Sequence, residues 1–361
     1  MRDLCVLFIL PYLLYASLKR PFIGLGLWLW TSAININQLV YGFATSVPFV
    51  KLFASVTLFS FLISTEKSRL RIEVLSVFII LFYFIATISN INCIGDSGYA
   101  WQKWMLFSKI IVFYFCAIAI IHEKIHFDLL IWMLVISIGA LSATEGLKFL
   151  VSGGTHRISM LKGIAGDNNF FGVMVVTVIP LVCYIFMQTT HHLLKLGVLV
   201  VIFLMVLGVF STFSRGAFIG LSVFMISFWK NSDKKLFWLA IIIIIISAAA
   251  YFMPDTWLTR MNTLENVSED GSFMGRVIAW KIAILIAMDN FFGGGFKAVE
   301  NISVWHYYAS FFYKLDFIPT ASAYPYFKAT HSIYFQVLSN HGFFGLFLFL
   351  MVLITAFFKI S

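Results

Sequence analysis

Long apolar stretches separated by short polar connections make up most of the chain. Several of them are long enough to cross a hydrocarbon core of about 30 Å as a helix. Their continuous apolar character predicts spanning helices, because a membrane β-barrel alternates polar and apolar positions. The pattern therefore predicts an all-α polytopic membrane protein with about eleven transmembrane helices. The stretches lie near residues 4–18, 21–34, 49–64, 73–90, 105–121, 127–142, 168–187, 196–212, 216–229, 235–253 and 342–358.

Composition supports lipid as the solvent of this chain. Apolar residues make up 61% of the sequence and charged residues 11%, with a mean hydropathy of +0.95. A water-soluble fold of this composition would expose a very large apolar surface. The net charge is +9, but Lys and Arg gather in alternate connections, which the positive-inside rule assigns to the cytoplasm. The basic balance therefore does not require a nucleic-acid partner.

The opposite connections are then expected to face the periplasm, and residues 254–341 form the largest of them. We expect a transmembrane bundle over residues 1–253, a large periplasmic loop with amphipathic helices over 254–341, and a final transmembrane helix over 342–361. One such helix is predicted around residues 275–288. This count puts the N-terminus outside, whereas an interfacial segment at 21–34 would put it inside, and both orientations stay open.

Arg215 lies in Ser214-Arg215-Gly216, between two apolar segments that are too close together to leave a real loop. Its guanidinium is therefore expected at or below the membrane surface, where an unpaired charge costs several kcal/mol. This position indicates an anionic partner. A snorkelling arginine that marks the end of a helix is the simpler alternative.

Three further arginines lie in connections on the same predicted face. Arg276 follows Gly275 at the start of the helix expected in the large loop, Arg260 precedes it, and Arg157 lies in a Gly-rich loop. Guanidinium groups bind phosphate oxygens in bidentate fashion, so two or three converging arginines suit a diphosphate. Each arginine alone is more typical of a solvated or headgroup-binding loop residue, so the diphosphate site depends on their convergence.

Lys109 lies about one turn inside the fifth apolar segment, close to its expected periplasmic end. Trp101, Lys103 and Trp104 precede it and are typical of an aromatic belt at the interface. A lysine at membrane depth is a candidate for binding an anionic headgroup or a diphosphate.

His331 opens the stretch His331-Ser332-Ile333-Tyr334, where the large loop returns to the final apolar segment. A neutral imidazole is suited to take a proton from a sugar hydroxyl near pH 7. A lone histidine is more often structural, and we expect that role for His341. No Asp-x-Asp pair occurs in the sequence, so we expect no metal and no cofactor, with arginines taking the place of a metal on the diphosphate.

The order and spacing of these motifs resemble the O-antigen ligase and polymerase superfamily over nearly the whole chain. The N-terminal stretch is similar, more narrowly, to the O-glycosylation ligases associated with exosortase systems. The motifs are Lys19-Arg20-Pro21, Trp101-x-Lys103-Trp104, Ser214-Arg215-Gly216, Gly275-Arg276 with Trp280, Gly293-Gly294-Gly295-Phe296, and His331-Ser332-x-Tyr334 with Leu338 and Gly342.

The resemblance implies a GT-C-type glycosyltransferase of the bacterial inner membrane whose active site faces the periplasm. Such an enzyme transfers a glycan from undecaprenyl diphosphate to lipid A core or another periplasmic acceptor, with inversion at the anomeric carbon. Carried over by position, Arg215 and Arg276 would clamp the diphosphate and His331 would activate the acceptor hydroxyl. Substrate binding is expected of Arg260, Arg157, Lys109, Lys103 and Tyr334. The acceptor, the glycan and the oligomeric state are not determined by these residues.

Two features depart from the resemblance. Relatives usually have a further span after the one at 342–358, so the C-terminus is expected to be truncated or naturally short. Lys328-Ala329-Thr330 precede His331, where many relatives carry Asp-Ala, so an acidic partner for the histidine is missing there.

Two other functions compete with ligation. A polymerase of the same superfamily uses the same donor and similar basic residues, and the motifs barely separate it from a ligase. A transporter or flippase for lipid-linked sugars is less favoured, because it predicts internal repeats and charges near mid-bilayer. Here the charges gather toward one face and in one long loop.

Overall fold

The computed structural model describes residues 2–34, 36–38, 40, 42–64, 72–158, 167–233, 235–236, 238–240, 243, 247, 271–320 and 323–360. Every regular element in these ranges is a helix, which confirms the all-α class. The chain divides into two compact units. Unit 1 comprises Met1–Ser68 and Cys116–Met261, and unit 2 comprises Arg69–Phe115 and Asn262–Ser361.

Six helical stretches in the described ranges are long and apolar enough to cross a membrane. Three shorter apolar helices accompany them, so the chain is a multi-pass membrane protein. The count of about eleven spans and the periplasmic loop at 254–341 stay predictions, and most of the expected segment at 235–253 lies outside the described residues. The six are Val74–Ile91, Ser97–Ile120, Lys124–Val151, Asn168–Gln188, His192–Ser211 and Ile333–Lys359.

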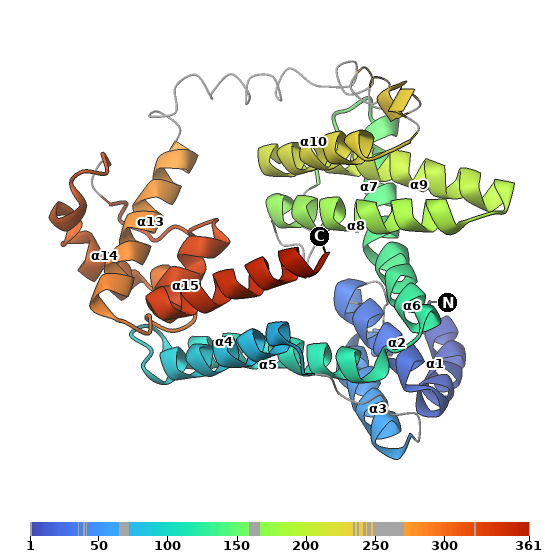
Figure 1. Cartoon of the computed structure of the whole chain (residues 1–361), viewed down its shortest axis with the longest axis horizontal. Helices are drawn as coiled ribbons and strands as arrows, with labels where there is room; N and C mark the ends of the chain where they lie inside the picture. Colours follow the sequence, from blue (N-terminus) through green and yellow to red (C-terminus); the bar gives the residue numbers. More distant parts are fainter. Residues whose placement is uncertain are drawn as a thin grey trace. The chain divides into compact units, whose positions relative to one another are not determined.

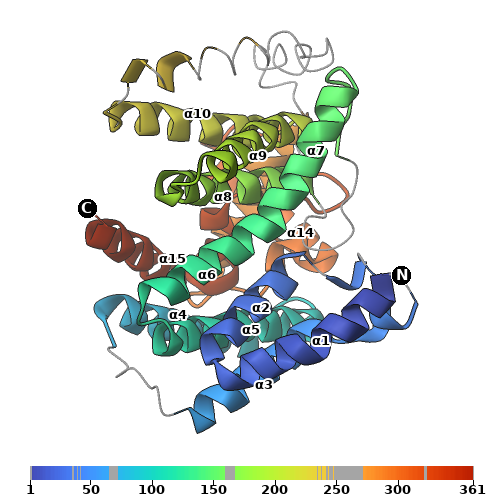
Figure 2. The same cartoon turned by 90° about the vertical axis from the view of Figure 1, so that its right-hand side faces the viewer.

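Unit 1 is a bundle of apolar helices (Figure 1). Figure 2 shows α6 and α7 as one long rod, because the π-helical turn η3 joins them without a break. The apolar stretch expected at 127–142 therefore ends later than predicted, since α7 continues to Val151. The elements are α1 (Arg2–Lys19), α2 (Pro21–Ile34), η1 (Ile36–Gln38), η2 (Gly42–Ser46), α3 (Phe49–Ile63), α6 (Lys124–Leu134), η3 (Val135–Gly139), α7 (Ala140–Val151), α8 (Asn168–Gln188), α9 (His192–Ser211) and α10 (Arg215–Lys230).

Small residues let α7 and α9 approach each other backbone to backbone. A Cβ atom built on Gly146 would lie 1.8 Å from the carbonyl oxygen of Leu204, and one on Gly208 would lie 2.4 Å from the Ser142 hydroxyl. Small residues at helix contacts are typical of membrane bundles, where close van der Waals packing replaces the hydrophobic effect. This contact joins the first half of α7 to the last part of α9, from which the 212–214 turn leads into α10.

Unit 2 is built around α13 and α15 (Figure 1). The helix expected around residues 275–288 is α13, and its Ile278, Ile282 and Ile286 are at most 1% exposed in the core of this unit. The elements are α4 (Val74–Ile91), the first part of α5 (Ser97–Ile120), α13 (Gly271–Asp289), η4 (Ala298–Glu300), α14 (Ile302–Ala309), η5 (Phe312–Leu315) and α15 (Ile333–Ile360).

A polar link fastens α14 to the end of α13. The Tyr308 hydroxyl donates to Asp289 Oδ2 over 3.1 Å and accepts from Asn290 Nδ2 over 2.8 Å. Burial is the main cause that raises the pKa of Tyr308 to about 12. The phenol therefore stays protonated and acts as a donor at all ordinary pH values.

Backbone-to-backbone contact at glycines joins the loop after α13 to a kink in α15. Gly294 N donates to Ser339 O over 2.8 Å, and Gly295 N donates to Asn340 O over 3.0 Å. Gly342 has a φ of 67° inside the helix, and a Cβ atom there would lie 2.0 Å from the Phe291 carbonyl oxygen. The Gly293-Gly294-Gly295 motif thus has a packing role that only glycine can fill.

We expect Gly342→Ala to destabilise unit 2, because the new Cβ meets backbone and the φ/ψ pair of Gly342 is almost restricted to glycine, which together cost about 1–3 kcal/mol or more. Thermal unfolding in detergent should show a midpoint lowered by several degrees. Gly197→Ala in α9 is the control, since nothing lies within 4 Å of the new Cβ. An equal midpoint for the two variants would contradict this account.

Candidate functional site

Arg276 lies in the first part of α13 in unit 2, on a half-buried side chain. Its Nε atom is buried and has no hydrogen-bond partner among the described residues. A buried donor without a partner costs about 1–3 kcal/mol, and a ligand that accepts this hydrogen bond would offset the cost. The guanidinium of Arg276 therefore has capacity for an anion.

Trp280 connects the Arg276 stretch of α13 to the stretch that precedes His331. It lies one helical turn after Arg276, and its Nε1 donates to the Thr330 carbonyl oxygen over 2.7 Å. Its ring also stacks on Phe335, with centroids 4.8 Å apart and planes at 9°. These contacts hold Arg276 and His331 on adjacent stretches of chain.

His331 is exposed and has a left-handed backbone, with a φ of 46°. Such a conformation is uncommon for a residue other than glycine, and strain of this kind concentrates at functional sites. Thr330, directly before it, is only 4% exposed. Tyr334 lies one turn into α15, where its side chain is 51% exposed. The imidazole is therefore open to a substrate while its backbone is held by buried neighbours.

Two lysines of unit 2 that the sequence did not single out lie close to this group. Lys328 Nζ lies 4.9 Å from the centroid of the Tyr326 ring and 5.8 Å from that of Tyr324. A Cβ atom on Gly275, beside Arg276, would lie 3.4 Å from Lys328 Cγ, so glycine allows this lysine to approach. The glycine at position 275 is thus the feature of the sequence that indicates this close approach.

Lys281 has a structural role instead. It is 3% exposed, and its Nζ donates to the Ile318 carbonyl oxygen over 3.2 Å and to Thr320 Oγ1 over 3.1 Å. The ring of Phe312 lies 4.7 Å from the same ammonium. A buried cation that is solvated by a carbonyl, a hydroxyl and an aromatic face fixes the 318–320 segment against α13.

The two lysines of α5 lie apart from this group. Lys103 Nζ lies over the Tyr99 ring at 4.8 Å, and Lys109 is exposed without a hydrogen bond or ion pair to another described residue. No hydrogen bond, ion pair or aromatic contact within the described ranges joins either lysine to Arg276 or His331. Their substrate-binding role stays a prediction.

In unit 1, the loop after α7 and the turn between α9 and α10 bring two other predicted residues together. Ile158 N donates to the Ser211 carbonyl oxygen over 3.1 Å, and the Arg157 guanidinium lies 5.9 Å from the centroid of the Phe213 ring. Arg215 follows two residues later as the first residue of α10. Arg157 and Arg215 therefore flank one turn.

The same turn presents the N-terminus of α10. Ser214 caps this helix, with its Oγ accepting from Ala217 N over 3.3 Å. Helix N-termini carry partial positive charge and free N–H groups, so they bind anions. With Arg157 and Arg215 beside it, this end of α10 is strongly cationic, and a phosphate group is the ligand it suits.

A buried carboxylate that sequence reasoning missed supports the Arg157 loop. Glu145 on α7 is 6% exposed, and it accepts from Lys148 Nζ over 2.6 Å and bonds His156 Nε2 over 2.7 Å. His156 directly precedes Arg157, so this pair ties the loop back to α7. The signal in the sequence is the one acidic residue of α7.

The structure thus brings Arg276 near His331 in unit 2 and Arg157 near Arg215 in unit 1. Arg260 lies outside the described residues. His341 has the structural position that we expected for it: it is 3% exposed, with its ring against Phe82 and Phe296 at 5.3 and 4.8 Å. Among the described residues, no group of three or more His, Cys, Asp or Glu side chains could hold a metal ion.

Comparison with known families agrees with the resemblance of the motifs. Residues 200–350 match the family model described as O-Antigen ligase. This match supports membership of the O-antigen ligase/polymerase superfamily. Residues 1–190 match the model of a family of unknown function (DUF5935). No curated protein and no solved structure matches the chain.

The O-antigen ligase match includes Arg215, Arg276, His331 and Tyr334. It supports a ligase- or polymerase-family function with a lipid-linked glycan and an acceptor as substrates in general. The family of unknown function covers Lys103, Lys109 and Arg157 together with Glu145. The link with exosortase systems stays a prediction.

We expect Glu145→Gln to loosen the loop that carries Arg157, because an amide cannot make charge-assisted bonds to both Lys148 and His156. Trypsin should then cleave after Arg157 several-fold faster in detergent, measured by mass spectrometry of the fragments. Glu300→Gln is the control, since it breaks only the ion pair between Lys297 and Glu300. Equal cleavage rates in both variants would contradict the role given to Glu145.

Proposed function

We propose that this chain is an O-antigen ligase-type glycosyltransferase. It takes a glycan from an undecaprenyl-diphosphate-linked donor and transfers it to lipid A core or another periplasmic acceptor, without a metal and with inversion. It works in the bacterial inner membrane, with its active site on the periplasmic side. Membership of the O-antigen ligase/polymerase superfamily supports the class of enzyme.

One observation carries the assignment of the chemistry. The Trp280 hydrogen bond to Thr330 holds an arginine with a buried, unpartnered Nε beside an exposed histidine. A cation that can bind a diphosphate and an imidazole that can accept a proton are the two groups that glycosyl transfer from a lipid diphosphate needs.

In the proposed reaction, a nitrogen of His331 takes the proton of the acceptor hydroxyl as its oxygen bonds to the anomeric carbon. The bond between that carbon and the diphosphate oxygen breaks on the opposite side, so the configuration inverts. The electron pair leaves with the lipid diphosphate. Arg276 binds the leaving oxygens and stabilises their charge, which grows in the transition state.

Arg215 is also proposed to bind the diphosphate, and the support for this role comes from its surroundings in unit 1. It begins α10, so its charge adds to that of a helix N-terminus, and Arg157 lies across the same turn. Bidentate guanidinium groups match phosphate geometry better than ammonium groups do. Lys103, Lys109, Arg260 and Tyr334 remain proposed substrate-binding residues.

The decisive experiment is in vitro transfer from purified undecaprenyl-diphosphate glycan. We expect His331→Ala to lose transfer by about 100-fold or more while donor binding persists, because the base is removed and the cations remain. Chelators should leave the wild-type rate unchanged. His306→Ala in α14 is the control, because His306 is also an exposed histidine of unit 2.

An active His331→Ala variant, or wild-type activity that chelators abolish, would refute this mechanism. The products also separate ligation from polymerisation in a deletion strain. Loss of ligated glycan with accumulation of full-length polymer supports ligation, whereas accumulation of single repeats supports polymerisation.

Arg215→Lys and Arg276→Lys should each lower kcat/KM for transfer at least tenfold, because an ammonium keeps the charge but loses the bidentate fork. Steady-state kinetics with varied donor concentration measures this effect. Arg20→Lys, which lies at the junction of α1 and α2, should retain the wild-type rate. Full activity of both active-site variants would show that a point charge is enough and that the diphosphate clamp is wrong.

A further inference from the structure

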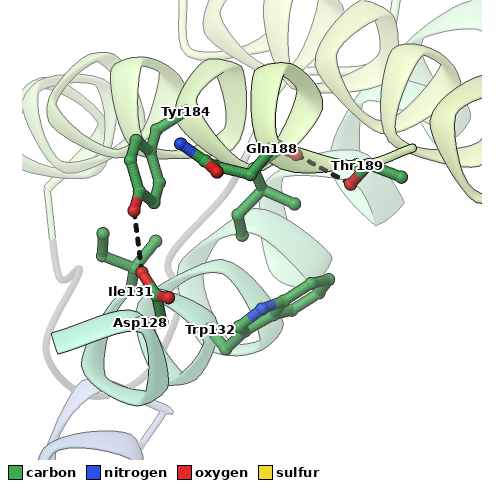
Figure 3. A pocket seen from close by; sticks show the side chains of 7 residues that line it. Asp128, Ile131, Trp132, Tyr184, Gln188 and Thr189 are labelled. Atoms are coloured by element: carbon green, nitrogen blue, oxygen red, sulfur yellow. Dashed lines mark hydrogen bonds between the residues drawn. The ribbon is translucent and has the colours of Figure 1, made fainter. Parts of the chain in front are cut away.

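A polar cavity of about 220 Å³ opens between α6 and α8 within unit 1. Asp128, Trp132, Tyr184, Gln188 and Thr189 line it together with two isoleucines (Figure 3). None of the residues assigned to glycosyl transfer contributes to it. The proposed reaction therefore leaves this cavity without a role.

The cavity lies at one end of two candidate membrane spans. Lys124 is the first residue of α6 and Gln188 is the last residue of α8, and the lining residues fall within about two turns of these ends. Trp132 is 43% exposed, which suits the interfacial aromatic belt. The cavity is therefore expected at the depth of lipid headgroups.

The cavity contains a carboxylate without a cationic partner. Asp128 Oδ1 accepts from the Tyr184 hydroxyl over 2.8 Å (Figure 3). The carboxylate forms no ion pair within the described part of the chain, and its second oxygen accepts no other hydrogen bond there. The second oxygen is therefore available to accept hydrogen bonds from a bound cation.

Two further features make the cavity attractive to a cation. Trp132 lies one turn after Asp128 on α6, and its indole borders the cavity (Figure 3); an indole face attracts ammonium groups. The C-terminus of α8 supplies the second feature, because the last turn of a helix carries partial negative charge. Carboxylate, indole and helix end thus act in the same direction.

A basic residue flanks this negative cavity on the same helix face. Lys124 lies one turn before Asp128, so their side chains neighbour each other. Its Nζ donates to Gln188 Oε1, a lining residue, over 3.4 Å. A cation-binding cavity beside an exposed ammonium has the charge pattern of a zwitterion that carries an amine next to a phosphate.

We propose that this cavity binds a phosphoethanolamine group, with its primary ammonium on Asp128 and Trp132 and its phosphate on Lys124. A primary ammonium has three N–H donors, so it can bond the free carboxylate oxygen, which a trimethylated ammonium cannot do. The headgroup of phosphatidylethanolamine and a soluble phosphoethanolamine compound both carry this chemistry. The site is independent of the proposed transferase activity.

Native mass spectrometry of the full-length protein in detergent tests the proposal. The protein is titrated with phosphatidylethanolamine, phosphatidylcholine or phosphatidylglycerol of identical acyl chains, and separately with soluble glycerophosphoethanolamine. We expect phosphatidylethanolamine to bind at least tenfold more tightly than the other two lipids. Binding of the lipid alone identifies a lipid site, whereas equal binding of the soluble compound identifies a headgroup site open to either source.

Asp128→Asn should remove this preference, since it keeps an oxygen for the Tyr184 hydroxyl but loses the charge. Asp233→Asn, an equal loss of charge on an exposed residue outside the cavity, should leave it intact. Trp132→Leu offers a second variant should Asp128→Asn fail to fold, and it should weaken binding several-fold. Equal affinity for the three lipids in the wild type, or an unchanged preference in both cavity variants, would overturn the proposal.

Discussion

The arrangement of unit 2 depends on two hydrogen-bonded attachments. They join α13 and the loop after it to α15 and the stretch before it. At one end, the Trp280 indole donates to the carbonyl of Thr330. At the other, the amide of Gly294 donates to Ser339. Because the two attachments follow the same order along both segments, the segments run in the same direction. The first attachment brings the part of α13 that carries Arg276 close to the stretch that leads to His331.

An unpaired charge is costly in a medium of low polarity, and this cost explains how the charged groups of this chain are arranged. Each buried or half-buried charge must find a compensating partner, and the partners found differ. Lys281 is solvated by a carbonyl, a hydroxyl and a ring, whereas Glu145 is held by the side chains of Lys148 and His156. Arg276 retains an unpartnered Nε among the described residues. Comparing the partners of these charged groups therefore separates the structural charges, Lys281 and Glu145, from Arg276, which is best suited to a ligand.

Motif-based reasoning selected His331, Arg276 and Arg157 as candidate site residues because each is a polar residue close to an apolar segment. It could not identify Glu145, because an acid inside a helix reveals its partners only when the helix and the following loop fold together. The triglycine stretch was recognised as part of a motif, but its role became clear only from the backbone of α15, nearly fifty residues later in the chain.

The sequence by itself determined the helical class, the membrane environment and the family, because uninterrupted apolar runs and ordered short motifs are local properties of the chain. It placed several helix ends incorrectly, since α5 begins at Ser97 and α7 continues to Val151, where tertiary packing extends a helix beyond its apolar run. Only the tertiary structure decided which charges meet. Contacts such as Trp280 with Thr330 or Asp128 with Tyr184 join residues from different segments of the chain, and their geometry depends on how the helices pack.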